Sequence, residues 1–481
     1  MDKTILVIGT YDTKDQELHY MCDRIRALGG QVVSMDVSVL GDPSQPTDIS
    51  KHDVTAAVGK TIQDAIDAGD ENGAMQIMAA GAAKLTAQLH AEGRIDAMVG
   101  LGGTMGTDLV LDCAQALPLG VPKYVVSTVS FSPLIPADRL SPDIQMILWA
   151  GGLYGLNSVC KSSLSQAAGA VLGAAQAVEA PVRSRPVIGM MSLGSSCLRY
   201  MKLLRDPLEA RGFEVAVFHA TGMGGMAFEA LAKQGYFAAV LDLALPELGN
   251  LMVGSVVNGG PDRLTNAGAA GVPQIVAPGC ADLIDFAGWQ EIPAAYADRP
   301  FHAHNRLIKS SGLSPDERRA LIRDIAARLA TARGPVHFVM PLQGVEEWDR
   351  EGEPAHDPEG LAAMIDEVRA AITVPCTEVD AHINDQAFSD AVLAVLDGWI
   401  ADGTLKVDHG PALRPPVRAV EDRPGHRPKP VLHDALCQRA FAPDAEWRDR
   451  RARDARRGGL GHHRHAIVRN RPDFGPVGPA L

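Results

Sequence analysis

The stretch that decides the fold is Ile95-Asp-Ala-Met-Val-Gly-Leu-Gly-Gly-Thr-Met-Gly-Thr-Asp108. An apolar run ends in glycines and hydroxyl residues, and a helical pattern follows, which predicts a buried strand, a tight turn and a helix start. Glycines let a ligand approach the backbone, and free N–H groups at a helix start attract anions. The spacing matches neither the dinucleotide fingerprint nor the P-loop, and many such turns bind nothing. Because of its glycines and its helix start, the turn is nevertheless a candidate phosphate site, with Thr104 and Thr107 as hydroxyl donors to a phosphate or its metal ion.

A second loop of this kind lies near the start of the chain. The apolar run Lys3–Gly9 predicts a strand, and Thr-Tyr-Asp-Thr-Lys follows it at positions 10–14. Thr13 and Gln16 have the spacing of a capping box at the next helix, which Gly29-Gly30 would end. Asp36, near the end of the next strand, has two interpretations: an acid that bonds a ribose, or a solvated strand-end acid.

Strands and helices alternate over the first 180 residues, which predicts right-handed crossovers and a mostly parallel sheet. A further strand over 123–129 ends in hydroxyl residues, including Ser127 and Thr128. Ligands of such sheets bind outside the carboxyl ends of the strands. We therefore expect three loops to converge at that edge: Gly9–Lys14, Gly100–Thr107 and Ser127–Ser130.

A second α/β series begins after Pro181 and Pro186. Ser195-Ser196 and the loop Thr221–Gly225 precede apparent helices and are further candidates for anion binding. The expected fold class is α/β, with two Rossmann-like subdomains of mostly parallel strands, a cleft between them and an irregular C-terminal tail. The expected domains are residues 1–180, 185–405 and the tail, 406–481.

Charge is unevenly divided along the chain. Residues 411–481 carry a net charge of +7 within a total of −13, so the preceding 410 residues carry −20. An acidic body argues against nucleic acid as its partner, because phosphate neutralisation needs a basic surface. The tail is rich in Arg, Pro and His and has no apolar period, which predicts disorder. Its Arg-to-Lys ratio also resembles GC-rich DNA read in the wrong frame.

The bulk composition favours a cytoplasmic protein. No run is long enough to span a membrane, and the N-terminus leads directly into a predicted strand rather than a signal peptide. The seven cysteines are scattered with no Cys-x-x-Cys pair, which is typical of a reducing compartment without structural zinc. The Ala- and Gly-rich helix within Gly151–Ala180 is expected to be a packing or dimer element, with Gly151–Gly173 as the contact region of a homodimer.

Reactive side chains also follow the strands of the second half. Cys280 follows an apolar strand, His302 and His304 stand close together, and Asp385 follows the last strand. Cys with His is the minimal nucleophile–base pair, and His-x-His with carboxylates can hold a metal. No sharply spaced catalytic signature is present. These four residues are therefore weaker catalytic candidates, and no metal ligands are assigned.

Five segments in order resemble a known family: Gly9–Lys14, Gly100–Thr107, His219–Gly225, Pro300–Asn305 and Asp380–Asp385. Together they resemble the Tm-one-like ATP-binding proteins, a family that includes the N-terminal region of a plant tobamovirus-resistance protein. The resemblance covers about residues 1–405, and the chain departs from the expected pattern in an altered segment that begins at Arg306, after Asn305. It implies two Rossmann-like subdomains, ATP and a magnesium ion. The nucleotide-binding residues expected on this basis are Thr10, Asp12, Thr13, Lys14, Gly100, Gly102, Gly103, Thr104, Thr107, Ser127 and Thr128.

Three functions stay open. The first is a cytoplasmic ATP-binding protein, with the nucleotide at the carboxyl edge of the N-terminal sheet. The second is a Cys/His-dependent or metal-dependent hydrolase or lyase in the second subdomain. The third is a regulatory or interaction protein whose nucleotide orders the cleft. The expected partners are a nucleotide and an unidentified small-molecule substrate or protein, with no membrane.

Overall fold

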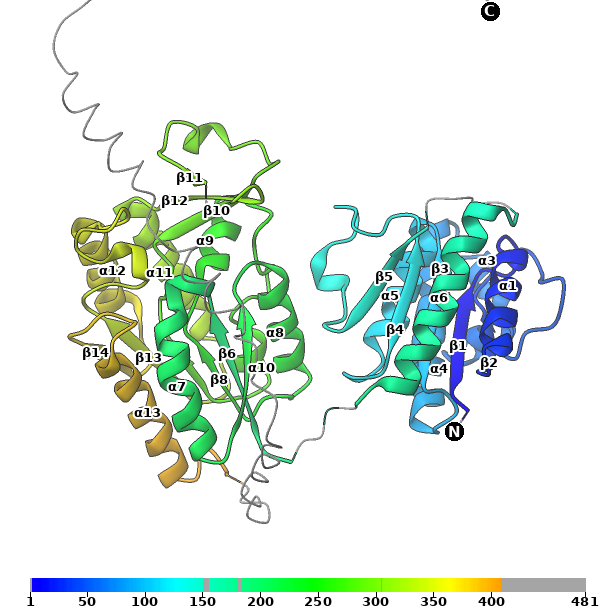
Figure 1. The fold of residues 1–481 in the computed structure, drawn as a ribbon, viewed down its shortest axis with the longest axis horizontal. Helices are drawn as coiled ribbons and strands as arrows, with labels where there is room; N and C mark the ends of the chain where they lie inside the picture. The colour runs from blue at the N-terminus through cyan, green and yellow to red at the C-terminus, as the bar shows by residue number, and fades with distance from the viewer. Residues whose placement is uncertain (1, 150–154, 180, 182–183, 304, 408–481) are drawn as a thin grey trace, which may run out of the picture. The chain divides into compact units, whose positions relative to one another are not determined.

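The structure, a computed structural model, describes residues 2–149, 155–179, 181, 184–303 and 305–407. Within them lie two α/β subdomains, each built on its own parallel sheet (Figure 1). The expected fold class, two Rossmann-like subdomains, is confirmed. Nearly all of the predicted tail, residues 408–481, lies outside the described residues.

The first subdomain is a five-stranded parallel sheet in the order β2-β1-β3-β4-β5. Its elements are β1 (Thr4–Gly9), α1 (Asp15–Ala27), β2 (Gln31–Asp36), α2 (Lys51–Ala56), α3 (Ile62–Ile66), α4 (Glu71–Ala91), β3 (Ala97–Gly102), α5 (Thr104–Gln115), β4 (Lys123–Ser127), β5 (Ile144–Leu148) and α6 (Ser158–Ala177). Strand β5 was not among the predicted strands.

Side chains alternate between the two faces of this sheet, because successive residues of a strand point to opposite sides. Ile5 and Val7 of β1 pack with α1 and α6, whereas Leu6 and Ile8 pack with α4 and α5. Ala167, Ala168 and Ala175 of α6 are buried in this core, so one face of the helix expected as a packing or dimer element packs within its own subdomain. Ala170 and Gly173 are exposed. The predicted homodimer contact stays a prediction, and residues 151–154 of it lie outside the described residues.

The second subdomain is a six-stranded parallel sheet in the order β14-β13-β9-β8-β6-β7. Its elements are β6 (Val187–Ser192), α7 (Leu198–Ala210), β7 (Glu214–His219), α8 (Met223–Lys233), β8 (Ala239–Asp242), α9 (Pro246–Met252), α10 (Asn266–Ala269), β9 (Gln274–Val276), β10 (Leu283–Ala287), β11 (His302–Ala303), β12 (Ile308–Gly312), α11 (Pro315–Leu329), β13 (Val336–Pro341), α12 (Pro358–Ala371), β14 (Cys376–Val379) and α13 (Gln386–Ala401).

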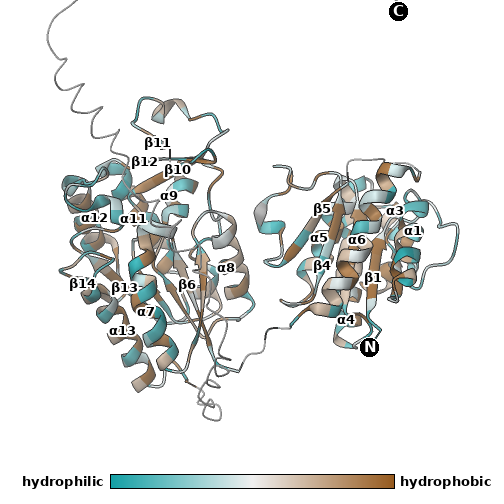
Figure 2. Cartoon of the chain, viewed as in Figure 1, coloured by the Kyte–Doolittle hydropathy of each residue, from teal (hydrophilic) through white to brown (hydrophobic). Residues whose placement is uncertain are grey.

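Two cores cover the faces of this second sheet. One includes α7 and α13, and the other includes α9, α11 and α12. Strands β10, β12 and β11 form a small antiparallel sheet that was not predicted. Figure 2 shows hydrophobic strands in both subdomains, with hydrophilic residues on covering helices such as α1.

Candidate functional site

The winding of the first sheet reverses between β1 and β3. These strands are neighbours, but the helix after β1 (α1) packs on one face of the sheet and the helix after β3 (α5) packs on the other. Loops that leave adjacent strands toward opposite faces open a crevice at the carboxyl edge, and ligands of doubly wound sheets bind there. The two loops that the sequence singles out, Gly9–Lys14 and Gly100–Thr107, follow these two strands (Figure 1).

The loop after β1 forms a tight turn before α1. The N–H groups of Thr13 and Lys14 donate to the carbonyl of Thr10, at 3.2 and 2.9 Å. The Thr10 and Thr13 hydroxyls lie 2.9 Å apart. The predicted capping box between Thr13 and Gln16 is therefore wrong: Lys14 is the N-cap, and no side chain caps α1. The turn directs the Thr13 hydroxyl to Thr10 instead of to the helix.

Two carboxylates organise the same loop. Asp36 is buried and accepts hydrogen bonds from the N–H groups of Tyr11 (3.2 Å) and Ser38 (2.9 Å). Asp36 is thus not a solvated strand-end acid, which corrects that interpretation; the ribose contact stays a prediction. Asp12 accepts a bond from the N–H of Gly41 through Oδ2, at 3.2 Å. Its Oδ1 is buried and has no hydrogen-bond partner among the described residues.

The turn after β3 brings the backbone of α5 close to the strand. A Cβ atom on Gly102 would lie 2.5 Å from the carbonyl carbon of Gly106, so only glycine fits there. Gly100 is also needed for packing, because its Cβ would lie 2.3 Å from Val110. Gly103 is different. It is the N-cap of α5, and the nearest atom to a Cβ built on it is the Thr128 hydroxyl, at 3.9 Å. The turn is therefore open at Gly103.

The predicted hydroxyl residues separate into two groups. Thr107 and Ser127 are buried, and their hydroxyl oxygens lie 2.6 Å apart. These two side chains join α5 to β4. Thr104 is exposed and Thr128 is half-buried, so their hydroxyls can still reach a ligand at the crevice.

Charge distinguishes the two helix starts. The first turn of α1 carries Asp15 and Glu17, and the first turn of α5 carries no acidic residue. Unpaired N–H groups at a helix start favour an anion, and nearby carboxylates oppose one. The start of α5, from Gly103 to Gly106, is therefore better suited to an anion than the start of α1.

In the second subdomain, Cys280 is fully buried, and its sulfur lies 3.4 Å from that of Cys197. Burial raises the pKa of the Cys280 thiol well above its ordinary value, which disfavours the thiolate that a nucleophile needs. Cys280 also has a φ of 55°, an uncommon conformation for a residue other than glycine. These observations do not favour it as a nucleophile.

The remaining catalytic candidates make other contacts. His302 is exposed, and its ring packs edge-on against Trp348, with centroids 5.4 Å apart. His304 lies outside the described residues. Asp385 accepts bonds from Arg350 at 3.1 Å and from the N–H of His382 at 3.3 Å. In the part of the chain that the structure describes, no hydrogen bond joins Cys280 to His302.

A buried polar cluster lies at the carboxyl ends of β9, β13 and β14, and its partners were not predicted from the sequence, although His382 follows the last predicted strand together with Asp385. His382 Nε2 lies 2.9 Å from Asp349, and His382 Nδ1 accepts the N–H of Asn384, at 3.1 Å. Both ring nitrogens are therefore engaged. Burial and the nearby carboxyl of Asp282 raise the pKa of Glu346 to about 10, so this side chain is neutral at pH 7.

The loop Thr221–Gly225 was expected to bind an anion, and it binds a carboxylate side chain of the same subdomain. The Glu247 carboxylate accepts hydrogen bonds from the N–H groups of Gly222 (2.5 Å) and Gly225 (3.2 Å). Glu247 is paired with the buried Arg263 at 2.7 Å, and Arg263 also pairs with Asp242. The loop is thus a structural anchor. Sequence spacing gave no signal of it, because Glu247 lies 22 residues beyond Gly225.

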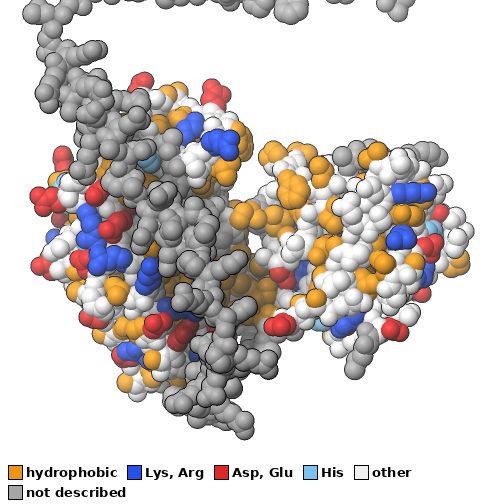
Figure 3. Space-filling view, in the orientation of Figure 1, with side chains coloured by type: hydrophobic (Ala, Val, Ile, Leu, Met, Phe, Trp, Pro, Cys, Tyr) orange, Lys and Arg blue, Asp and Glu red, His pale blue; other side chains and the backbone are white. Residues whose placement is uncertain are grey.

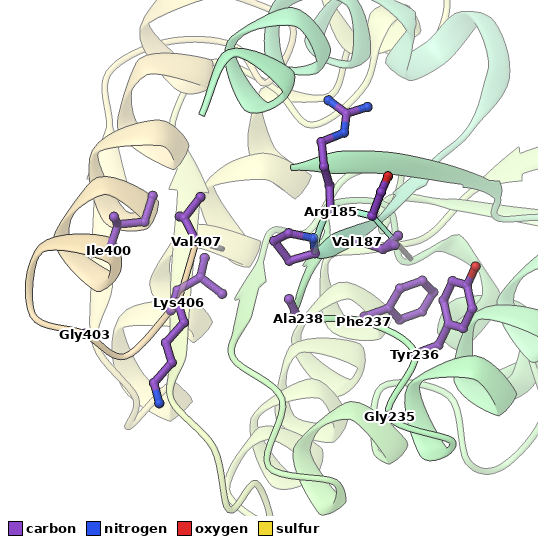
Figure 4. Close-up of a pocket in the computed structure, with 13 residues that line it drawn as sticks. Arg185, Val187, Gly235, Tyr236, Phe237, Ala238, Ile400, Gly403, Lys406 and Val407 are labelled. Carbon is purple, nitrogen blue, oxygen red and sulfur yellow. The ribbon is translucent and has the colours of Figure 1, made fainter. Parts of the chain in front are cut away.

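A pocket of about 750 Å³ lies at the amino edge of the second sheet, beside the starts of β6 and β8. Its two cationic side chains, Arg185 and Lys406, point away from one another (Figure 4). None of the predicted site residues lines it.

In the residue ranges that the structure describes, no group of three or more His, Cys, Asp or Glu side chains is placed to hold a metal ion. Across the same ranges, no helix is both long enough and apolar enough to cross a membrane.

The chain is similar to proteins of one family along both of its subdomains. The N-terminal domain of the uncharacterised protein family UPF0261 matches residues 3–180, and its C-terminal domain matches residues 185–400. A UPF0261 protein of Brucella melitensis is 55% identical over 403 residues, which cover 83% of this chain and 96% of that protein. A UPF0261 protein of Clostridium tetani is 32% identical, over 82% of this chain and 98% of its own length.

A plant protein is also similar. The ToMV susceptible protein tm-1(GCR26) of Solanum lycopersicum is 25% identical over 416 residues, which cover 81% of this chain and 55% of the tomato protein. This match agrees with the family resemblance read from the five sequence segments. The chain belongs to the uncharacterised protein family UPF0261, with both the N-terminal and the C-terminal domain of that family.

Proposed function

We propose that this protein binds ATP at the carboxyl edge of its first sheet, with the phosphates at the start of α5. The observation that carries the proposal is the reversal of winding between the adjacent strands β1 and β3, each of which is followed by a loop that contains glycine or hydroxyl residues. The resemblance to Tm-one-like ATP-binding proteins supports the nucleotide as the ligand.

The phosphates would be held by backbone N–H groups and by one lysine. Residues 104–106 form the first turn of α5, where backbone N–H groups lack partners within the helix. Lys14 is half-buried in the loop after β1, and its ammonium makes no hydrogen bond or ion pair within the described residues. An unpaired cation in the loop of the adjacent strand would add to the attraction of the α5 start for an anion.

The residues present also fit a magnesium ion bound together with the nucleotide. Mg²⁺ is usually held by one or two carboxylates, phosphate oxygens and waters, rather than by a cage of protein ligands. Asp12 Oδ1 is a buried carboxylate oxygen without a partner among the described residues, and Thr104 has an exposed hydroxyl. These two residues would hold the ion, which would neutralise phosphate charge. Thr107, expected to share this role, would instead support the turn through Ser127.

Titration calorimetry with ATP in the presence of magnesium tests the proposal. Replacing Lys14 with Met is expected to weaken binding about tenfold to a hundredfold, because a hydrogen bond to a charged group contributes about 1.5–3 kcal/mol. Asp12→Asn is expected to weaken binding with magnesium but not without it. Lys233→Met, an exposed lysine of α8, is the matched control and is expected to change nothing. If Lys14→Met and Asp12→Asn both bind ATP as tightly as the wild type does in the presence of magnesium, the nucleotide does not bind at this edge.

A further inference from the structure

Phe131 is a large aromatic side chain on the surface of the first subdomain. Its side chain is 78% exposed, and its backbone φ is 63°. A positive φ is rare for a bulky residue and is found where the surrounding structure imposes it, often at ligand sites. An exposed aromatic ring and a strained backbone thus coincide at one position, and burial in the core explains neither.

The strain arises from a tight turn just after β4. The N–H of Ser132 donates to the carbonyl of Val129 at 3.0 Å, which places Phe131 third of four residues. A turn with positive φ at the third position favours glycine or asparagine. Here the chain places a phenylalanine at that position.

Hydrogen bonds fix this turn beside the proposed phosphate site. The N–H of Thr128 donates to the carbonyl of Gly102 at 3.2 Å, and the Ser130 hydroxyl donates to the carbonyl of Ile147 at 3.0 Å. The turn is therefore hydrogen-bonded to the carboxyl ends of β3 and β5, the two strands that flank β4. The Thr128 hydroxyl is the nearest atom to the open side of Gly103. Thr128 thus faces the start of α5, and Phe131 lies three residues after it.

We propose that Phe131 is the residue on which the base of the nucleotide stacks. This inference rests on the proposed function and assigns the base to the β4 side of the phosphates. Aromatic rings offer a flat apolar surface to any nucleobase. Two further apolar side chains with exposed surface, Leu134 in the same loop and Met105 in the first turn of α5, would flank the base. Figure 3 shows that hydrophobic side chains are exposed on this subdomain.

The opposite side of the crevice is less suited to the base. Leu40, in the loop after β2, is 79% exposed but has no aromatic ring. On that side Asp36 is buried in hydrogen bonds to the loop, and the start of α1 carries two acidic residues. Because Leu40 is apolar and as exposed as Phe131, Leu40→Ala is a matched control for Phe131→Ala.

The experiment compares ATP with inorganic tripolyphosphate, both with magnesium, because tripolyphosphate lacks a base. For Phe131→Ala we expect ATP affinity to fall about 5-fold to 150-fold, which corresponds to 1–3 kcal/mol per stacked base, with tripolyphosphate affinity unchanged. Phe131→Trp should keep the affinity for ATP, and Leu40→Ala should behave as the wild type. Phe131→Gly relieves the backbone strain, so it should melt no lower than the wild type and yet lose ATP affinity.

The outcomes separate the two proposals. Wild-type protein that binds neither ligand contradicts the proposed function itself. Wild-type protein that binds ATP, with no loss in either Phe131→Ala or Phe131→Gly, overturns the stacking assignment alone. A selective loss in Leu40→Ala would also overturn it, because the base would then lie on the β2 side.

Discussion

The hydroxyl oxygens of Thr107 and Ser127 lie 2.6 Å apart in the interior of the first subdomain, where they join the first turns of α5 to the end of β4. Each hydroxyl also bonds to the backbone: Ser127 accepts the N–H of Val129 at 3.0 Å, and Thr107 donates to the carbonyl of Gly102 at 3.4 Å. Removing one partner therefore takes away the bond between the two hydroxyls, which contributes about 0.5–1.5 kcal/mol. We expect Thr107→Val and Ser127→Ala each to lower the free energy of unfolding by that amount. The double variant should lose less than the sum of the two, as measured by urea unfolding. A strictly additive double variant would show that the two hydroxyls do not interact.

Neighbouring glycines of the central turn should differ sharply in what they tolerate. Gly102→Ala places a methyl group 2.5–2.6 Å from the backbone of Gly106 and Thr107, so the start of α5 must shift. Gly103→Ala meets no atom closer than 3.9 Å. Overpacking typically costs about 1–3 kcal/mol, so we expect a loss of this size for Gly102→Ala and less than about 1 kcal/mol for Gly103→Ala. Thermal unfolding of the two variants would check this, and equal losses would contradict the close approach at Gly102.

The buried carboxyl of Glu346 should make stability depend on pH. Its pKa rises from 4.5 to about 10 on folding, first because of burial and second because of Asp282. Its contribution is therefore fully present below pH 4.5 and declines as pH rises toward 10, by at most about 1.4 kcal/mol per pH unit. Glu346→Gln removes the proton uptake. Measured by urea unfolding, the free energy of unfolding of the variant minus that of the wild type should be larger at pH 8 than at pH 5. A difference that does not change with pH would contradict this environment for Glu346.

Glu247 should be among the most sensitive positions of the second subdomain. Its loss would leave Arg263 short of one buried partner and would free the N–H groups of Gly222 and Gly225. Breaking a buried ion pair from one side costs about 3–5 kcal/mol, and we expect a loss of this order for Glu247→Ala. Glu209→Ala breaks an exposed pair with Arg205 and should cost no more than about 0.5 kcal/mol. Similar losses in the two variants, measured by denaturant unfolding, would rule out the anchor role.

The sequence was sufficient to predict the parallel sheets and their main loops. Strands such as β1 and β3 are buried on both faces, so each is a continuous apolar run that glycine ends abruptly. Strand β5 was missed because it is only partly buried. The β10–β12 pair was missed because polar residues such as Asp285 and Ser310 pair across it.

The site was predicted less completely, because spacing along the chain does not show which partners folding brings together. Thr13 has a capping spacing, yet its hydroxyl lies beside Thr10. Thr107 has the position of a ligand residue, yet it is buried against Ser127, which lies 20 residues away. The partners of both residues are set by the tertiary fold. Conversely, the open position of Gly103 could be anticipated from the local sequence, because it lies between a buried strand and a helix start.

The measurement that tests the central claim most directly is the melting temperature with and without Mg-ATP, for the wild type, Gly103→Ala and Gly103→Asp. Aspartate is a favourable N-cap, so Gly103→Asp should fold at least as stably as Gly103→Ala, while its carboxylate repels phosphate. A ligand that binds only the folded state adds about 2.7 kcal/mol at a hundredfold excess over Kd. We expect Mg-ATP to raise the melting temperature of the wild type and Gly103→Ala, but not of Gly103→Asp. No shift in the wild type, or an equal shift in all three, would contradict a nucleotide at the start of α5.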